Sequence, residues 1–177
     1  MRADAERNRA KILAAAEEVF AELGAAASTE EVARRAGVAI GTVFRHFPTK
    51  NDLLAAIMKD LVLRFTREVE TLAGHGDPAT ALFTFFTGLV EQAAAKKTVV
   101  DLLDVDIRVG RQLEQLRAAI GDLLVRAQQA GTVRMDIQLD EVMALLTATS
   151  QGALHAGWDR DLRDRTLSIV FAGLRPA

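Results

Sequence analysis

The sequence predicts an all-α protein of about nine helices, divided into a three-helix N-terminal domain at residues 1–49 and a larger helical domain at residues 50–177. Three observations support this fold class. Apolar residues recur at spacings of three and four, which is the period of an amphipathic helix. Strand-like alternation is nearly absent, and no Asn-Gly or Asp-Gly pair marks a hairpin turn. Glycine and proline fall between the periodic segments, where helices end.

The first two predicted helices are delimited by their capping residues. The first ends at Gly24, and the second begins at Thr29 and ends after about two turns at Gly37. Ser28 and Glu31 form a capping box, in which each side chain can bond to the backbone amide of the other residue. The apolar stripe of the first helix consists of Ile12, Ala16, Val19, Phe20 and Leu23.

The later helices follow from the same reasoning. A third helix spans about Ile40 to His46, because Pro48 disfavours helical backbone in the residue before it. A long fourth helix over about residues 50–72, with Thr49 as its N-cap, connects the two domains and ends before the break "AGHGDP". Five further helices are predicted near residues 78–95, 98–107, 111–130, 139–157 and 161–174.

Composition restricts the class of protein. Half of the residues are apolar and 26% are charged, as in a globular domain. The absence of cysteine excludes disulfides and thiolate metal sites, and we expect a cytoplasmic protein. The N-terminus mixes both charge signs and does not resemble a signal peptide. The longest uncharged run, Val142 to Trp158, contains polar residues and is too short to span a membrane.

One window carries the functional signal. After Glu31 no acidic residue occurs before Asp52, although the chain as a whole has a net charge of −2. Within this window two short helices are joined by a tight turn at Gly37, which is the pattern of a helix-turn-helix. The outward-facing residues would meet phosphates or base edges in the major groove. They are Arg34, Arg35, Ile40, Thr42, Arg45 and His46.

The same window carries a family resemblance. The segment "LG…STEEVARRAGVAIGTVFRHFPTKNDLL" resembles the DNA-binding signature of the TetR family of bacterial transcriptional regulators, over roughly residues 5–60. The resemblance implies that Ser28 caps the second helix and reaches a phosphate, and that Gly41 and Thr42 lie at the groove. It also implies that His46 and Lys50 hold phosphates. The predicted DNA-binding set is therefore Ser28, Arg34, Arg35, Ile40, Gly41, Thr42, Phe44, Arg45, His46 and Lys50.

Two residues depart from the family pattern. The family usually has tyrosine where this chain has Phe44, so a hydroxyl that contacts phosphate is replaced by an apolar ring. Ala39 stands where serine is usual, so the third helix lacks a side-chain N-cap, which costs about 1 kcal/mol. A small helical bundle with merely solvated charges is the alternative to DNA binding. The capping box, Gly37 and Pro48 together favour DNA binding.

The second domain offers a predicted dimer interface. The segment Val142 to Trp158 carries no charge on any face, so we expect this helix to be buried on nearly all sides, within its own subunit on one side and against a partner on the other. Ala144, Ala148, Gly152 and Ala156 recur every four residues and form a stripe of small side chains. This helix and the last helix would form a four-helix bundle across a twofold axis, whereas packing of the small-residue stripe within one chain is the alternative. The predicted interface comprises Ala144, Ala148, Gly152, Ala156, Leu162, Thr166, Ile169, Val170 and Gly173.

A small-molecule pocket in the second domain is a further implication of the resemblance, since "PATALFTFFTGLV" at residues 78–90 is uncharged and aromatic. The candidate lining residues are Phe83, Phe86, Thr87, Val90, Leu103, Ile107, Arg108 and His155. Each of them is also compatible with ordinary core packing.

These predictions combine into one functional expectation. The chain would be a ligand-responsive regulator, most simply a repressor that binds a palindromic double-stranded DNA operator as a homodimer and is released by an unknown small-molecule effector. We expect no membrane partner, no cofactor and no metal. Enzyme activity is disfavoured because the chain has no Cys or Tyr and its three His are far apart in sequence. A helical protein-interaction module without DNA binding is the other alternative.

Overall fold

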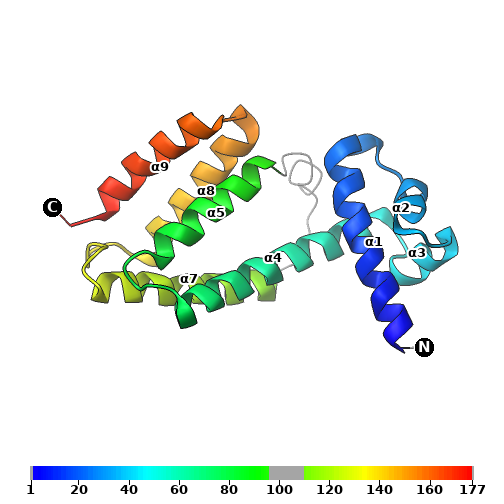
Figure 1. The fold of residues 1–177 in the computed structure, drawn as a ribbon, viewed down its shortest axis with the longest axis horizontal. Helices are drawn as coiled ribbons and strands as arrows, with labels where there is room; N and C mark the ends of the chain where they lie inside the picture. The colour runs from blue at the N-terminus through cyan, green and yellow to red at the C-terminus, as the bar shows by residue number, and fades with distance from the viewer. Residues whose placement is uncertain (1, 96–109, 177) are drawn as a thin grey trace. The chain divides into compact units, whose positions relative to one another are not determined.

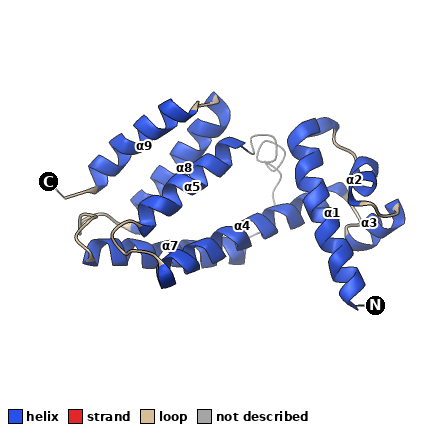
Figure 2. Cartoon of the chain, in the orientation of Figure 1, coloured by secondary structure: helices blue, strands red, loops and turns tan. Residues whose placement is uncertain are grey.

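The computed structural model describes residues 2–95 and 110–176, and its regular elements there are all helical, which confirms the predicted fold class (Figures 1 and 2). The helix predicted at residues 98–107 lies outside the described residues. The elements are α1 (Arg2–Leu23), the 3₁₀ turn η1 (Gly24–Ala26), α2 (Thr29–Ala36), α3 (Ile40–His46), α4 (Lys50–His75), α5 (Ala81–Ala95), α7 (Gly110–Gln129), α8 (Leu139–Ala156) and α9 (Arg160–Leu174). None of these helices is long and apolar enough to cross a membrane.

The chain forms two compact units that divide inside α4, between Leu61 and Val62. Leu53 and Ile57 of α4 belong to the core of the N-terminal unit. Phe65, further along the same helix, packs edge-on against Phe85 of α5, with ring centroids 6.4 Å apart. The sequence-based boundary before Lys50 therefore differs from the division by packing, because α4 supplies core residues to both units.

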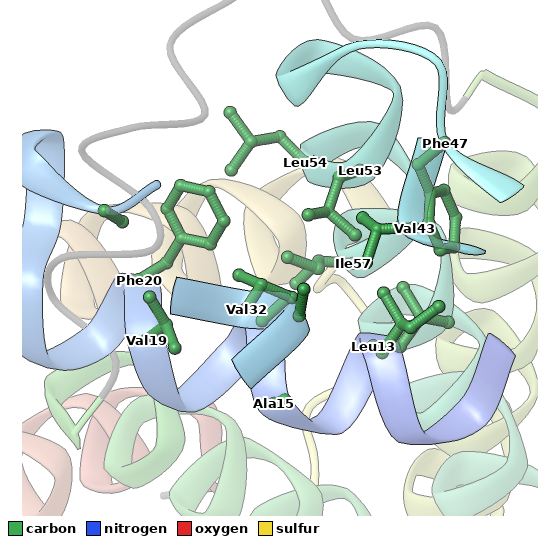
Figure 3. Close-up of a cluster of buried hydrophobic side chains, with 14 residues drawn as sticks. Leu13, Ala15, Val19, Phe20, Val32, Val43, Phe47, Leu53, Leu54 and Ile57 are labelled. Carbon is green, nitrogen blue, oxygen red and sulfur yellow. The ribbon is translucent and has the colours of Figure 1, made fainter. Parts of the chain in front are cut away.

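The core of the N-terminal unit joins α1, α2, α3 and the start of α4 (Figure 3). Phe20 of α1, Val32 of α2 and Val43 of α3 are fully buried. Leu53 of α4 is buried beside them. This shared core fixes the orientation of the two short helices, which at seven and eight residues are too short to be stable alone.

Local signals set the boundaries of α2. The Ser28 Oγ accepts a hydrogen bond from the Glu31 backbone N–H at 3.2 Å, as predicted. Gly37 ends the helix with φ +65°, a left-handed conformation that glycine adopts without steric strain. The predicted return bond from Glu31 to the Ser28 amide is wrong, because the Glu31 carboxylate pairs with Arg34 and Arg35 instead.

α4 is longer than predicted and ends at His75 rather than near residue 72. Its N-terminus is capped at Thr49, whose Oγ1 accepts from the Asp52 backbone N–H at 3.1 Å. The Asp52 carboxylate accepts from the Thr49 backbone N–H at 3.0 Å in return. α5 begins at Ala81 rather than Pro78, after a turn in which Asp77 Oδ1 accepts from the Ala79 backbone N–H at 3.0 Å.

The C-terminal unit is built around α5 and α8. Leu82, Phe85 and Phe86 of α5 are completely buried. α8 contributes Leu146 and Leu154, which are also buried. Phe171 of α9 closes one side of this core and makes edge contacts with Phe83 and Phe86 at centroid distances of 4.9 and 5.4 Å.

Candidate nucleic-acid interface

The exposed face of α3 is the central feature of the N-terminal unit. Val43 and Phe47 hold the helix to the core, with 0% and 3% of their surface exposed. Ile40 and Phe44, which flank this buried side, are 38% and 44% exposed. Gly41 and Arg45 are also exposed. A short helix anchored on one side and open on the other can enter the major groove of DNA.

The N-terminus of α3 has no side-chain cap, as predicted from Ala39. The Ala39 backbone has φ −66° and ψ 145°, and its side chain makes no capping hydrogen bond. The Thr42 backbone N–H donates to the Ala39 carbonyl oxygen at 2.8 Å, which closes the first turn. Thr42 itself is half-buried at the side of the helix.

Arg35 links α1 to α2. Its Nη1 donates to Glu22 Oε1 of α1 at 2.8 Å, and its Nε donates to Glu31 Oε1 of α2 at 3.1 Å. Only 24% of the Arg35 side chain is exposed. The structure thus places Arg35 between two carboxylates, so the geometry favours a positioning role for this residue over direct contact with phosphate.

Arg34 shares the same carboxylate. Its Nε donates to Glu31 Oε2 at 2.8 Å, although 69% of its side chain remains exposed. The hydrogen bonds from Arg34 and Arg35 lower the pKa of Glu31 to about 2. The hydrogen bond from Arg35 also holds the pKa of Glu22 below its usual value. Glu31 therefore stays ionised at neutral pH and offsets part of the positive charge of α2.

Lys50 is also engaged inside the unit. Its Nζ donates to the Ala27 carbonyl oxygen at 2.8 Å and lies 5.3 Å from the centroid of the Phe20 ring. These contacts join the start of α4 to the segment before α2. A phosphate would have to compete with them for the same ammonium group.

Three other predicted residues occupy distinct positions. Ser28 is half-buried and caps α2, and His46 is half-buried with its ring 6.2 Å from that of Phe47. Arg45 extends from the exposed face of α3 and forms no ion pair within the described part of the chain.

Sequence reasoning missed Arg9, an exposed residue of α1 whose guanidinium lies 5.5 Å from the Phe47 ring centroid. Only its position four residues before Leu13 could have indicated this contact.

Comparison with known proteins agrees with this geometry. A family model described as bacterial regulatory proteins of the tetR family matches residues 12–57. A second, described as the C-terminal domain of SbtR-like transcriptional regulators, matches residues 77–176. A TetR transcription regulatory protein from Mycobacterium vanbaalenii is 38% identical, with a TM-score of 0.80 over 99% of both chains. This chain belongs to the TetR family. The expectation of a DNA-binding transcriptional regulator rather than an enzyme is thereby confirmed.

Other relatives extend the family assignment. The TetR regulator SCO0520 from Streptomyces coelicolor is 33% identical, with a TM-score of 0.78 over 96% of this chain and 99% of that one. The transcriptional repressor Rv3405c from Mycobacterium tuberculosis is 46% identical over 63 residues. That match spans 35% of this chain and 34% of the repressor, so this similarity concerns about a third of each protein.

The second domain of this TetR-family protein has an outer face on α8 and α9 in which small and aliphatic residues lie among the exposed polar residues Thr147, Gln151 and His155. Ala144, Ala148 and Ala156 are exposed on α8. On α9, Leu162 and Ile169 are 41% and 74% exposed. Gly173 is exposed as well, whereas Thr166 and Val170 are half-buried. A groove of about 500 Å³ between the two helices is lined by Ile137, Glu141, Ala144, Leu145, Ile169, Val170, Gly173 and Leu174.

The packing of α8 within one chain bears on two expectations. Its inner side is buried, including Val142 and Leu146, and its outer side, where a second copy was expected to pack, is exposed in the single chain. Gly152 does not belong to the outer stripe, because the Trp158 ring of the same chain packs onto it. A Cβ at Gly152 would lie 2.6 Å from Trp158 Cζ2.

The predicted ligand pocket is only partly assembled. Phe86 and Val90 are completely buried core residues, and His155 is exposed on α8. Leu103, Ile107 and Arg108 lie outside the described residues. Phe83 and Thr87 do share a groove of about 690 Å³ on α5, whose lining is Glu68, Ala79, Thr80, Phe83, Thr84, Thr87, Gly88, Glu91, Thr132 and Arg175. Within the described residues no group of three or more metal-ligating side chains occurs.

Proposed function

We propose that this TetR-family regulator is a repressor that binds a palindromic operator as a homodimer and releases it on binding a small molecule. The observation that carries the proposal is the exposed face of α3, held to its core by Val43 and Phe47. Such a helix reads one half-site, and two of them must lie about 34–36 Å apart to read successive major grooves.

The small and aliphatic residues on the outer face of α8 and α9 support dimerisation. Ile169 is an exposed aliphatic side chain, and the neighbouring Ala144, Ala148 and Gly173 have small or no side chains. Small residues allow two helices to approach closely, and burial of the apolar surface favours association. A second copy of the same chain would cover this surface through a twofold axis, because such an interface is self-complementary.

The groove on α5 supports release by a ligand. It combines the Phe83 ring, the Arg175 guanidinium stacked 5.3 Å from it, and the hydroxyl groups of threonine residues. An apolar wall with a few polar groups is typical of small-molecule sites. A ligand there would release DNA only if it bound better to a conformer with wrongly spaced recognition helices.

The proposal is tested with DNA fragments selected from a random library by the full-length protein. Selected sequences should be palindromic, and log affinity should fall linearly with log salt concentration, as phosphate contacts require. A scrambled fragment of equal length is the control for sequence preference. Non-palindromic selected sites, or binding insensitive to salt, would contradict the proposal.

A further inference from the structure

The exposed face of α3 is largely apolar. Ile40 and Phe44 are 38% and 44% exposed, and Arg45 is the basic residue that shares this surface. Ile40 and Phe44 are four residues apart and therefore neighbours on one side of a helix. They do not belong to the core cluster of the unit, to which α3 contributes Val43.

Gly41 leaves the surface beside these two side chains open. A Cβ added at Gly41 would meet no other atom of the chain within 4 Å. The backbone of the first turn of α3 is therefore bare on this side. A base pair can approach Ile40 and Phe44 without an intervening side chain.

The chemistry of these side chains restricts which base they favour. Neither can donate or accept a hydrogen bond, so neither pairs with the N7, O6 or N4 groups of guanine, adenine and cytosine. Covering those groups with an apolar side chain removes water from them without replacing its hydrogen bonds, which is unfavourable. Thymine is the base that presents an apolar group, the C5-methyl, in the major groove.

Several basic residues near α3 are already paired within the protein, which increases the share of operator affinity expected from apolar contacts. Arg35 is held by Glu22 and Glu31, and Lys50 Nζ donates to the Ala27 carbonyl oxygen. Arg34 is paired with Glu31. With these cations engaged, base contacts by Ile40 and Phe44 contribute a larger share of operator affinity than they would beside free cations.

We propose that the protein reads its operator through thymine C5-methyl groups, contacted in the major groove by Ile40 and Phe44. This inference rests on the proposed operator binding. It adds that Ile40 and Phe44 select thymine over the other bases. Each operator half-site accordingly contains thymines at the positions facing these two residues.

Replacing thymine by uracil tests the inference, because deoxyuridine differs from thymidine in duplex DNA only by the missing C5-methyl. In a selected operator each thymine is replaced in turn, and the Kd is measured by fluorescence anisotropy. We expect a loss of about fourfold at each contacted thymine, the effect of exposing roughly one methyl group. Thymines outside the selected operator sequence, on the same DNA fragment, serve as controls, and replacing them should not change the Kd.

Protein variants assign each methyl group to a side chain. Ile40→Ala and Phe44→Ala should each abolish the uracil effect at one position, whereas the matched variant Arg45→Gln should bind more weakly but keep both effects. Unchanged thermal unfolding of the variants would show that the exposed side chains were removed without loss of folding. Uracil effects that persist in both alanine variants would overturn the assignment.

The outcomes separate this inference from the proposed function. Salt-sensitive, sequence-preferring binding with no uracil effect at any thymine would overturn the methyl readout and leave operator binding intact. Loss of all salt-sensitive binding would overturn operator binding itself. Replacing one contacted thymine by cytosine and then by 5-methylcytosine provides a further check, because the added methyl should restore part of the affinity.

Discussion

At the scale of single residues, the basic side chains of the N-terminal unit differ in role although they look alike in the sequence. Arg35 lies between Glu22 and Glu31, with 24% of its side chain exposed. Arg45 projects from the open face of α3 and forms no ion pair with another described residue. One arginine therefore joins two helices, and the other is available to DNA.

This difference predicts opposite effects of matched substitutions. Arg35→Gln should lower the Tm, because Glu22 and Glu31 lose their shared partner. Arg45→Gln should leave the Tm unchanged and reduce the slope of log Kd against log salt by about one, the contribution of one phosphate contact. Thermal unfolding and salt titration of both variants check this. A lower Tm for Arg45→Gln with an unchanged Arg35→Gln variant would contradict the assignment.

Phe44→Tyr tests the missing hydroxyl. The ring keeps its exposed position, so the selected operator sequence should not change. The added hydroxyl can donate to a phosphate, and we expect Kd to fall on the order of fivefold. Anisotropy titrations of both proteins on one operator measure this, and an equal Kd would show that the hydroxyl makes no such contact.

The pKa of Glu31 predicts a stability change in acid. Hydrogen bonds from Arg34 and Arg35 lower this pKa from 4.5 to about 2. Because the folded-state pKa is depressed, the stabilisation is fully present above about pH 4.5 and is lost as pH falls towards 2. The Tm difference between the wild type and Glu31→Gln should therefore shrink across this window. Glu30→Gln is the neighbouring control, and a constant difference for Glu31→Gln would disprove the linkage.

At the scale of elements, α3 is held more by tertiary packing than by its own sequence. It has seven residues and no side-chain N-cap, since alanine occupies position 39. Val43 and Phe47 compensate by burial in the shared core. The helix proposed to meet DNA is thus positioned by its buried residues, and Gly41 and Arg45 on its exposed side are outside the core cluster.

Ala39→Ser should strengthen this element. The Ala39 backbone already has the extended conformation of an N-cap residue, so a serine hydroxyl could accept from the first turn without rearrangement. We expect the free energy of unfolding to rise by about 1 kcal/mol, measured by denaturant titration. Ala39→Val adds a side chain without a hydroxyl and should not reproduce the gain. No gain from serine would show that the first turn is satisfied in another way.

At the scale of the whole molecule, the proposed dimer depends on the outer face of α8 and α9. The outer face of α8 and α9 includes Ala148, which is exposed, and Ile169, which is 74% exposed. The space over Gly152 is already occupied by the Trp158 ring of the same chain. The proposed interface is therefore narrower than the small-residue stripe of the sequence suggests.

Ala148→Glu should disrupt the proposed dimer. Because Ala148 is exposed in the single chain, a glutamate there is solvated in the monomer, but burial in an interface would leave its charge unpaired. Analytical ultracentrifugation should show a shift towards monomer, and operator affinity should fall with it. Ser168→Glu is the matched control, because Ser168 is exposed on α9 outside the proposed interface. A stable Ala148→Glu dimer would show that the interface lies elsewhere.

The sequence by itself determined the helical fold class, the limits of α2 and α3 and the family. These follow from local chemistry: apolar spacing, the Ser28 cap, Gly37 and Pro48 act within a few residues of the chain. Only the tertiary structure decided that Arg35 and Lys50 are engaged within the unit, that Gly152 receives Trp158 and that Phe86 is core. Glu22, Ala27 and Trp158 reach these partners through folding, and spacing along the chain does not record which side chains the packed helices bring together.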